Sequence, residues 1–279
     1  MSARIFDAHI HCSESQDDLL IPYARFNGLE YTLGELLSEM ETENIEGGLL
    51  LSPPLKGGGI FPNDGIIDLC NKSRGKLLPI LTVEPSRDAV NDALELARKY
   101  AGKVKGFKIR LGYVEAFASD PVFSPIYDYA ESVNLPVLFH TGDTATSSGS
   151  LAHSHPLTLD SLANKREELK IIACHFGNPW IGDVAELIYK HPNVYADISG
   201  LFTGREKEAG AYGAKFLDSL VQKVSEAMYF AGTAEKVLFG TDYPVEAISS
   251  AISFAKQLKI EEEDRSKIFF DNARRVFSL

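Results

Sequence analysis

The segment Ile5-Phe6-Asp7-Ala8-His9-Ile10-His11 combines a short apolar run with two histidines that are two residues apart. A short run of this kind, bounded by polar residues, predicts a buried strand. Residues two apart on a strand leave the same face, so His9 and His11 can reach one ion, and Asp7 shares their parity. Taken alone, the segment fits two histidines packed in a core equally well.

Seven further apolar runs follow the first one, and each interval leaves room for a helix. The eight predicted strands cover residues 5–11, 48–51, 77–83, 104–110, 136–140, 170–175, 194–198 and 237–240, with helical patterns such as 33–43, 87–100 and 248–258 between them. Strands that alternate with helices favour a parallel sheet, and eight units favour a closed (β/α)₈ barrel. We therefore expect residues 1–279 to form a single barrel domain, without internal repeat or linker.

The segments that follow the predicted strands are long, whereas those that precede them are short. The longest cover residues 12–32, 53–64, 141–156 and 200–213. Active sites of (β/α)₈ barrels are built from the loops at the carboxyl ends of the strands. The long loops therefore predict that the active site lies at the carboxyl ends of the strands. No GxGxxG motif follows the first strand, which weakens the dinucleotide-binding alternative.

Composition narrows the class of protein further. The chain has 279 residues, of which 44% are hydrophobic and 24% charged, and a formal net charge of -11. Without a basic patch, this charge argues against nucleic acid or an anionic membrane as partner. No stretch approaches the ~20 apolar residues of a spanning helix, no leader pattern is seen, and the three cysteines have no CxxC spacing. We expect a cytoplasmic enzyme that acts on a small molecule; a homodimer is only a working assumption.

Three more residues of ligand type end predicted strands. His140 ends the fifth, His175 ends the sixth, and Asp242 follows the eighth. Four of the seven histidines thus lie at one mouth of the predicted barrel, which a random scatter would rarely produce. Neutral imidazoles and a carboxylate suit zinc or another first-row divalent ion, which can activate a bound water. Asp242 could then accept the proton of that water, while His175 could bind metal or stabilise developing negative charge.

These motifs, taken in order, resemble the amidohydrolase superfamily, in particular its amidohydrolase-related branch of barrel hydrolases and decarboxylases. The resemblance spans essentially the whole chain. Its motifs are DAHIH at 7–11, GFKI at 106–109, FHTG at 139–142, CHFG at 174–177 and FGTDYP at 239–244.

The resemblance implies a set of roles for these residues. His9, His11, His140 and Asp242 would hold the metal, and His175 would be the catalytic histidine or, in a two-metal site, a ligand. Lys108 occupies the position of a bridging carboxylated lysine in two-metal members, although related branches keep it unmodified. We favour one metal, with zinc as the first choice and manganese, iron or cobalt as alternatives.

Other residues near the mouth carry weaker signals. Arg110 has the parity of Lys108 and could bind a substrate carboxylate, or it could form a rim salt bridge with an acidic loop residue. We expect Cys174 to face the helices, because neighbours on a strand point in opposite directions. His153 and His155 are expected to face solvent in their loop rather than to contact substrate, and no nucleophilic role is expected for Cys12 or Cys174. Ordinary packing or loop capping is the expected role of Glu84, Asp197 and Ser199.

Three functions remain open at this point. The first is hydrolysis of a carboxylic ester, lactone or amide by metal-activated water. The second is non-oxidative decarboxylation of an aromatic or unsaturated acid, because the branch that this chain resembles contains both kinds of enzyme. The third is a barrel that binds metal without turnover, which a mouth of long loops makes less attractive.

Overall fold

The chain folds into a barrel of parallel strands. The structure is a computed structural model that describes residues 4–204 and 210–279. Within these residues, eight strands pair in chain order, and each pairing is parallel. They are β1 (Ile5–His11), β2 (Ile45–Leu51), β3 (Leu77–Thr82), β4 (Gly106–Ile109), β5 (Val137–Phe139), β6 (Ile171–Ala173), β7 (Val194–Asp197) and β8 (Val237–Leu238).

Backbone hydrogen bonds between β1 and the segment that follows β8 close the sheet. Ala8 N donates to Phe239 O (2.9 Å), and His11 N donates to Tyr243 O (2.8 Å). In the opposite sense, Asp242 N donates to His9 O (2.8 Å). The predicted (β/α)₈ barrel is therefore confirmed, and its closure sets Asp242 beside the two histidines of β1.

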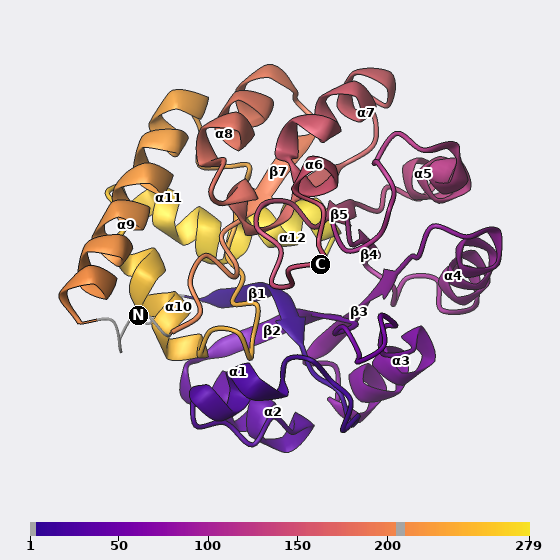
Figure 1. Cartoon of the computed structure of the whole chain (residues 1–279), viewed down its shortest axis with the longest axis horizontal. Coiled ribbons are helices and arrows are strands. Elements are labelled where there is room, and N and C mark those ends of the chain that lie inside the picture. Colours follow the sequence, from indigo (N-terminus) through magenta and orange to yellow (C-terminus); the bar gives the residue numbers. More distant parts are fainter. Residues whose placement is uncertain (1–3, 205–209) are drawn as a thin grey trace.

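Helices surround the strands, as Figure 1 shows, with α9 and α10 on one side of the ring and α3 and α4 on the other. The α-helices are α1 (Ile21–Phe26), α2 (Leu33–Thr42), α3 (Asn63–Lys72), α4 (Arg87–Lys99), α5 (Ser124–Ser132), α6 (Leu151–Ser154), α7 (Asp160–Lys165), α8 (Ile181–Lys190), α9 (Ala211–Ala231), α10 (Ile248–Gln257), α11 (Glu262–Ser266) and α12 (Asn272–Phe277). Short turns complete them: η1 (Pro121–Phe123), η2 (Pro156–Leu159), η3 (Cys174–Gly177) and the π-helical η5 (Lys267–Asp271).

The helix α4 shows how the sequence pattern produces an element. Ser86 accepts a hydrogen bond from Ala89 N and caps the first turn. Apolar residues at helical spacing, including Val90, Leu94 and Ala97, are buried against the barrel. The three predicted helical patterns correspond to α2, α4 and α10, with ends that differ by one residue.

Strand ends differ more from the predictions. β2 begins three residues earlier than predicted, and β4, β5 and β6 are shorter than the predicted runs. Two segments predicted as loops contain the short helices α1 and α6. Part of the predicted loop 200–213 lies outside the described residues.

One apolar layer fills the inside of the barrel, and a second lies between the strands and the surrounding helices. The inner layer contains Leu49, Ile80, Leu138 and Ile172, together with the C-terminal helix residue Val276. Lys105 and Lys170, which precede β4 and β6, donate hydrogen bonds to carbonyl groups of the C-terminal segment. The C-terminal segment therefore covers the amino-terminal end of the barrel, and the carboxyl end is left for the site.

No described helix has the length and apolar character needed to cross a membrane.

Candidate metal centre

His9, His11 and Asp242 form a triad at the carboxyl end of the barrel. Their ligand-type atoms all lie within 4.8 Å of one another. Asp242 Oδ1 is 3.1 Å from His11 Nε2 and 3.5 Å from His9 Nε2. The two histidines share a strand, whereas Asp242 follows β8, so the triad joins the first strand to the last.

An extra residue in β1 determines which side chains reach this triad. Asp7 pairs with Gly48 and Ile10 with Leu50, so three steps along β1 match two along β2. Such a bulge interrupts the alternation of side chains. The predicted common direction of Asp7 and the histidines is therefore wrong. Asp7 instead accepts hydrogen bonds from His9 N and from the backbone and hydroxyl of Thr241, which ties β1 to the segment that carries Asp242.

Hydrogen bonds to Nδ1 orient both histidines of the triad. His11 Nδ1 lies 3.0 Å from Leu51 O, which can only accept, so Nδ1 carries the proton. His9 Nδ1 lies 3.1 Å from Asp197 Oδ2 and is protonated for the same reason. Each Nε2 is then free to bind an ion, the arrangement that carboxylate and carbonyl partners give to metal-bound histidines.

Asp197 and Ser199 organise two histidines at once, although packing was their expected role. Asp197 Oδ1 accepts from His175 N (2.9 Å), while its other oxygen holds His9. Ser199 Oγ donates to Asp197 Oδ1 (2.5 Å), and Ser199 O accepts from His175 Nδ1 (3.0 Å). In the sequence, the only indication of a role for Asp197 and Ser199 is their position around the end of the seventh predicted strand.

His175 reaches the site through a left-handed turn. β6 ends at Ala173, and His175 and Phe176 in η3 have φ angles of 61° and 45°. The ring of His175 lies 5.0 Å from that of His9 and 4.8 Å from that of His140, measured between centroids. Gly200 (φ 59°) allows this approach, since a Cβ there would lie 2.6 Å from Asp242 Oδ2 and 2.8 Å from His175 Nδ1.

Cys174 faces the interior of the barrel, so its predicted outward orientation is wrong. It packs in the inner layer with Ile172, and its Sγ lies 2.8 Å from Lys108 Nζ. The alternation of β6 thus places Cys174 inward, and only the left-handed turn brings the next residue, His175, inward as well.

His140 lies beside the triad but is not part of it. Its Nε2 is 2.9 Å from Asp143 O and therefore carries the proton, which leaves Nδ1 as the free nitrogen. The ring of Tyr113 stacks against that of His140 at 4.7 Å. Its predicted role as a fourth ligand stays a prediction.

Burial favours the neutral form of His9, His140 and His175. Burial and the nearby charge of Lys108 lower the pKa of His9 to about 4. Burial likewise lowers the pKa of His140 and of His175. Burial on its own would raise the pKa of Asp242, but its contacts with His11 and the other histidines hold that pKa below the ordinary value. The centre therefore offers the neutral imidazoles of these three histidines and an ionised carboxylate.

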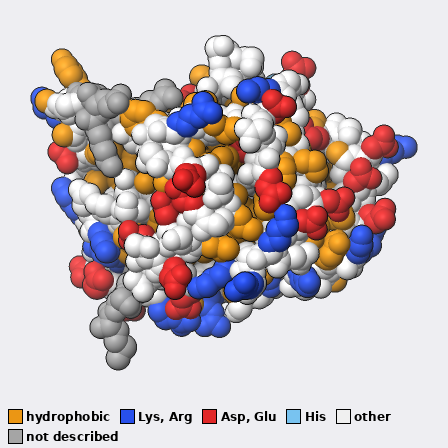
Figure 2. Space-filling view, turned by 90° about the horizontal axis from the view of Figure 1, so that it is seen from below, with side chains coloured by type: hydrophobic (Ala, Val, Ile, Leu, Met, Phe, Trp, Pro, Cys, Tyr) orange, Lys and Arg blue, Asp and Glu red, His pale blue; other side chains and the backbone are white. Residues whose placement is uncertain are grey.

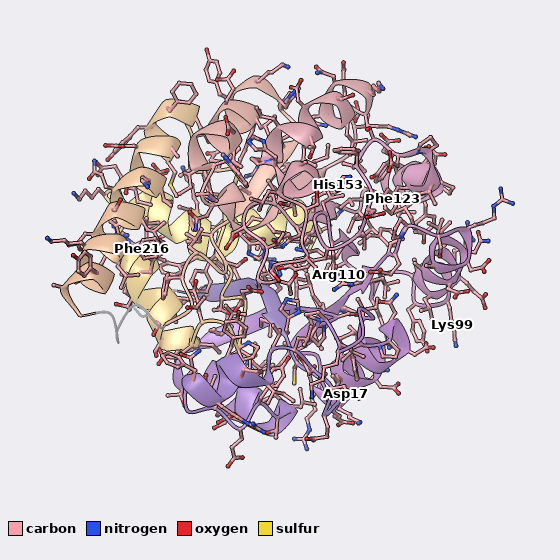
Figure 3. All side chains as sticks on the ribbon, viewed as in Figure 1. Asp17, Lys99, Arg110, Phe123, His153 and Phe216 are labelled. Atoms are coloured by element: carbon pink, nitrogen blue, oxygen red, sulfur yellow. The ribbon has the colours of Figure 1, made fainter. Side chains whose placement is uncertain are left out.

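Arg110 forms the rim salt bridge that was one of its two expected roles. Arg110 Nη2 lies 3.1 Å and Nε 3.3 Å from Glu84 Oε1. Figure 3 places Arg110 near the centre of the ring, whereas Lys99 and Phe216 lie at its periphery. Its predicted contact with a substrate carboxylate stays a prediction.

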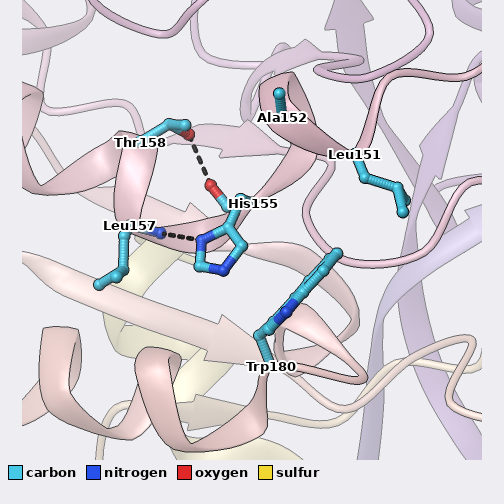
Figure 4. Close-up of a pocket in the computed structure, with 6 residues that line it drawn as sticks. All are labelled: Leu151, Ala152, His155, Leu157, Thr158 and Trp180. Carbon is cyan, nitrogen blue, oxygen red and sulfur yellow. Dashed lines mark hydrogen bonds between the residues drawn. The ribbon is translucent and has the colours of Figure 1, made fainter.

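His153 and His155 lie outside the triad. His153 stacks on Phe117 at 4.4 Å. His155 accepts a hydrogen bond from Leu157 N and stacks on Trp180, where both line an open, largely apolar cavity of about 550 Å³ (Figure 4). No residue that lines this cavity belongs to the triad.

The triad fits a divalent ion for three reasons. His9 Nε2 is buried and has no hydrogen-bond partner among the described residues. Acceptor atoms of His11 and Asp242 face each other at 3.1 Å, which requires either a proton or a cation between them. Two imidazoles and a carboxylate match the ligand preferences of first-row divalent ions. Fold and site together define a metal-binding (β/α)₈ barrel.

Comparison with known sequences identifies the family. Residues 62–279 match the family model of the amidohydrolases, and the chain belongs to that family. A gamma-resorcylate decarboxylase from Polaromonas sp. is 27% identical over 132 residues, which cover 46% of this chain and 40% of that protein. A second one, from Rhizobium sp., is 22% identical over 185 residues, which cover 57% and 55%. The matched regions thus span about half the length of these curated relatives.

Solved structures resemble the whole barrel. The 2,6-dihydroxybenzoate decarboxylase from Rhizobium has a TM-score of 0.70 at 20% identity, over 99% of this chain and 98% of that one. A dihydroxybenzoic acid decarboxylase from Polaromonas sp., with bound manganese and the inhibitor 2-nitroresorcinol, has 0.68 at 17%, over 99% and 97%. A probable 2-pyrone-4,6-dicarboxylic acid hydrolase from Acinetobacter baumannii has 0.68 at 18%, over 99% and 100%. At these identities, the likenesses establish the fold.

Proposed function

We propose that this protein catalyses the metal-dependent, non-oxidative decarboxylation of a hydroxylated aromatic acid. The observation that carries the proposal is the triad of His9, His11 and Asp242 in a chain whose two matched curated relatives are both decarboxylases. This choice reverses the order of the two activities expected from the sequence, in which hydrolysis came first.

The net reaction breaks the bond between the ring carbon and the carboxylate, releases carbon dioxide, and adds one proton to that carbon. His9, His11 and Asp242 would hold a divalent ion, which would supply Lewis acidity toward the oxygen atoms of the substrate. Asp242 is ionised and could receive a proton from the substrate hydroxyl or solvent and deliver it to the ring carbon. His175, whose Nδ1 donates to Ser199 O, keeps an unprotonated Nε2 that can accept a hydrogen bond from a hydroxyl group of the substrate.

The identity of the metal belongs to this proposal. Two imidazoles and a carboxylate accept either zinc or manganese. The Polaromonas structure contains manganese, so manganese joins zinc as a first ion to test. Lys108 contacts the thiol of Cys174 and is not part of the triad, and this arrangement favours one metal per chain.

Hydrolysis of a carboxylic ester or lactone is the second candidate function. It is supported by the whole-length likeness to the probable pyrone dicarboxylic acid hydrolase. The same Asp242 would act as base toward an activated water.

The test is the release of carbon dioxide from a panel of hydroxybenzoic acids by protein loaded with manganese or zinc. We expect release that a chelator abolishes, that added metal restores, and that the His9→Ala/His11→Ala variant lacks. His191→Ala is the matched control, because His191 pairs with Asp160 away from the triad. Cleavage of lactones without carbon dioxide release would favour the second candidate, and full activity without metal would exclude both.

A further inference from the structure

Lys108 places a buried side-chain nitrogen with unfilled hydrogen-bond capacity inside the barrel. Its side chain is 4% exposed, and it forms no ion pair with any described residue. Its hydrogen-bond partner is the thiol of Cys174, a weak acceptor, although an ammonium group has three N–H donors. A buried charge that is not paired is expensive unless a ligand completes its surroundings.

Thr82 brings a second unsatisfied group to the same place. It pairs with Lys108 across β3 and β4, and it lies two residues beyond Ile80 of the inner layer, so it shares that face. Thr82 is 2% exposed, and its hydroxyl has no hydrogen-bond partner in residues 4–204 and 210–279.

Arg110 provides the contrast. It lies two residues closer to the mouth than Lys108, but Glu84 already neutralises its guanidinium. Lys108 is therefore the basic side chain at this side of the barrel that forms no ion pair with a described residue, and the carboxylate of Asp197 interacts with it from farther away.

We propose that Lys108 and Thr82 form an anion subsite, which takes one ionised oxygen of the substrate acid while the triad of His9, His11 and Asp242 binds the other end of the reacting group. The inference rests on the proposed function, since it assumes an acidic substrate. It assigns to Lys108 a role in substrate recognition in place of a role as a metal bridge.

The test compares an anion with a neutral molecule of similar shape. Binding of salicylate and salicylamide to the manganese-loaded protein is measured by calorimetry, together with metal content, in the wild type, Lys108→Met and Lys103→Met. Lys103 is exposed before β4, so its variant makes the same charge change outside the barrel. We expect Lys108→Met to lower the preference for salicylate over salicylamide by roughly tenfold or more, at unchanged metal content, and Lys103→Met to leave it unchanged.

Thr82→Val keeps the shape of the side chain and tests the subsite without removing the charge. We expect it to weaken salicylate binding by a few-fold, with an equal or higher melting temperature, because the hydroxyl lacks a partner in the free protein. An unchanged preference in both variants would overturn the subsite, as would failure of the wild type to bind millimolar salicylate. Loss of one metal equivalent in Lys108→Met would make Lys108 a metal bridge instead.

Turnover separates this inference from the proposed function. Selective binding of salicylate through Lys108 without carbon dioxide release from any acid would leave the subsite intact and refute the decarboxylase. Carbon dioxide release with the same KM in the wild type and Lys108→Met would support the decarboxylase and refute the subsite.

Discussion

Asp197 forms hydrogen bonds with three residues of the centre. It holds the ring of His9 and the backbone of His175, and it accepts from Ser199. Partners of this kind fix the tautomer and direction of a metal-bound histidine. The centre therefore depends on a residue outside the triad of His9, His11 and Asp242.

Asp197→Asn is predicted to weaken metal binding by about 10- to 100-fold. The amide nitrogen of asparagine can face His9 Nδ1 only if that nitrogen gives up its proton, which places the proton on Nε2 and removes the free lone pair. Chelator competition measures the affinity. Asp92→Asn, on the exposed face of α4, is the control with the same charge change. Equal affinities in the two variants would show that Asp197 does not orient His9.

Two buried groups give the metal-free protein opposite responses to pH. The pKa of His9 is lowered to about 4, so between pH 4 and 6.5 the unfolded chain binds the extra proton and His9 makes stability rise with pH. Burial raises the pKa of Asp7 to about 7, despite its hydrogen bonds from Thr241. Between pH 4 and 7 the folded state then binds the extra proton, and Asp7 makes stability fall as pH rises.

Asp7→Asn is predicted to remove the second of these responses. The free energy of unfolding of the metal-free variant should rise with pH more steeply than that of the wild type, by about 1.4 kcal/mol per pH unit between pH 4.5 and 6.5. Urea unfolding at several pH values measures this slope. Asp68→Asn, exposed on α3, should have the slope of the wild type. A variant slope equal to or below that of the wild type would contradict the raised pKa of Asp7.

At the level of elements, the segment after β7 controls the space around the site. Gly200→Ala is predicted to lower metal affinity and to destabilise the protein by about 1–2 kcal/mol or more. The added Cβ would meet Asp242 and His175 within 2.8 Å, in a backbone conformation with φ of 59°. Gly182→Ala in α8, where a Cβ meets nothing within 4 Å, should be neutral or stabilising. Urea unfolding and chelator competition on both variants make the comparison.

The sequence predicted the elements of the site better than the directions of its side chains. Strand and helix alternation, the helices at 33–43 and 87–100, and the mouth that collects the histidines all follow from periodicity and loop length. The bulge in β1 and the left-handed turn at His175 do not, because each changes parity through a local backbone conformation that alternation cannot detect. Asp7 and Cys174 were therefore assigned to the wrong faces.

At the scale of the whole molecule, both signs of surface charge occur across the face shown in Figure 2, although the net charge is -11. The centre itself joins the first and last strands of the barrel, since it links His9 and His11 of β1 to Asp242 after β8. An ion bound there stabilises the closed barrel, because the unfolded chain cannot hold these ligands together.

Addition of manganese or zinc is therefore predicted to raise the stability of the metal-free protein. At one hundred times the dissociation constant, the gain should be about 2.7 kcal/mol. Thermal melts with and without metal measure it. The His9→Ala/His11→Ala variant should show no such gain, whereas His191→Ala should respond as the wild type does. A gain of equal size in the double variant would mean that metal binds elsewhere.

The closure of the sheet between β1 and the segment after β8 also sets an order of events during biosynthesis. The histidines of β1 are translated more than 200 residues before their carboxylate partner Asp242. Over that interval a nascent chain displays an incomplete ligand set. An ion that needs all three ligands would therefore be loaded only once the barrel closes.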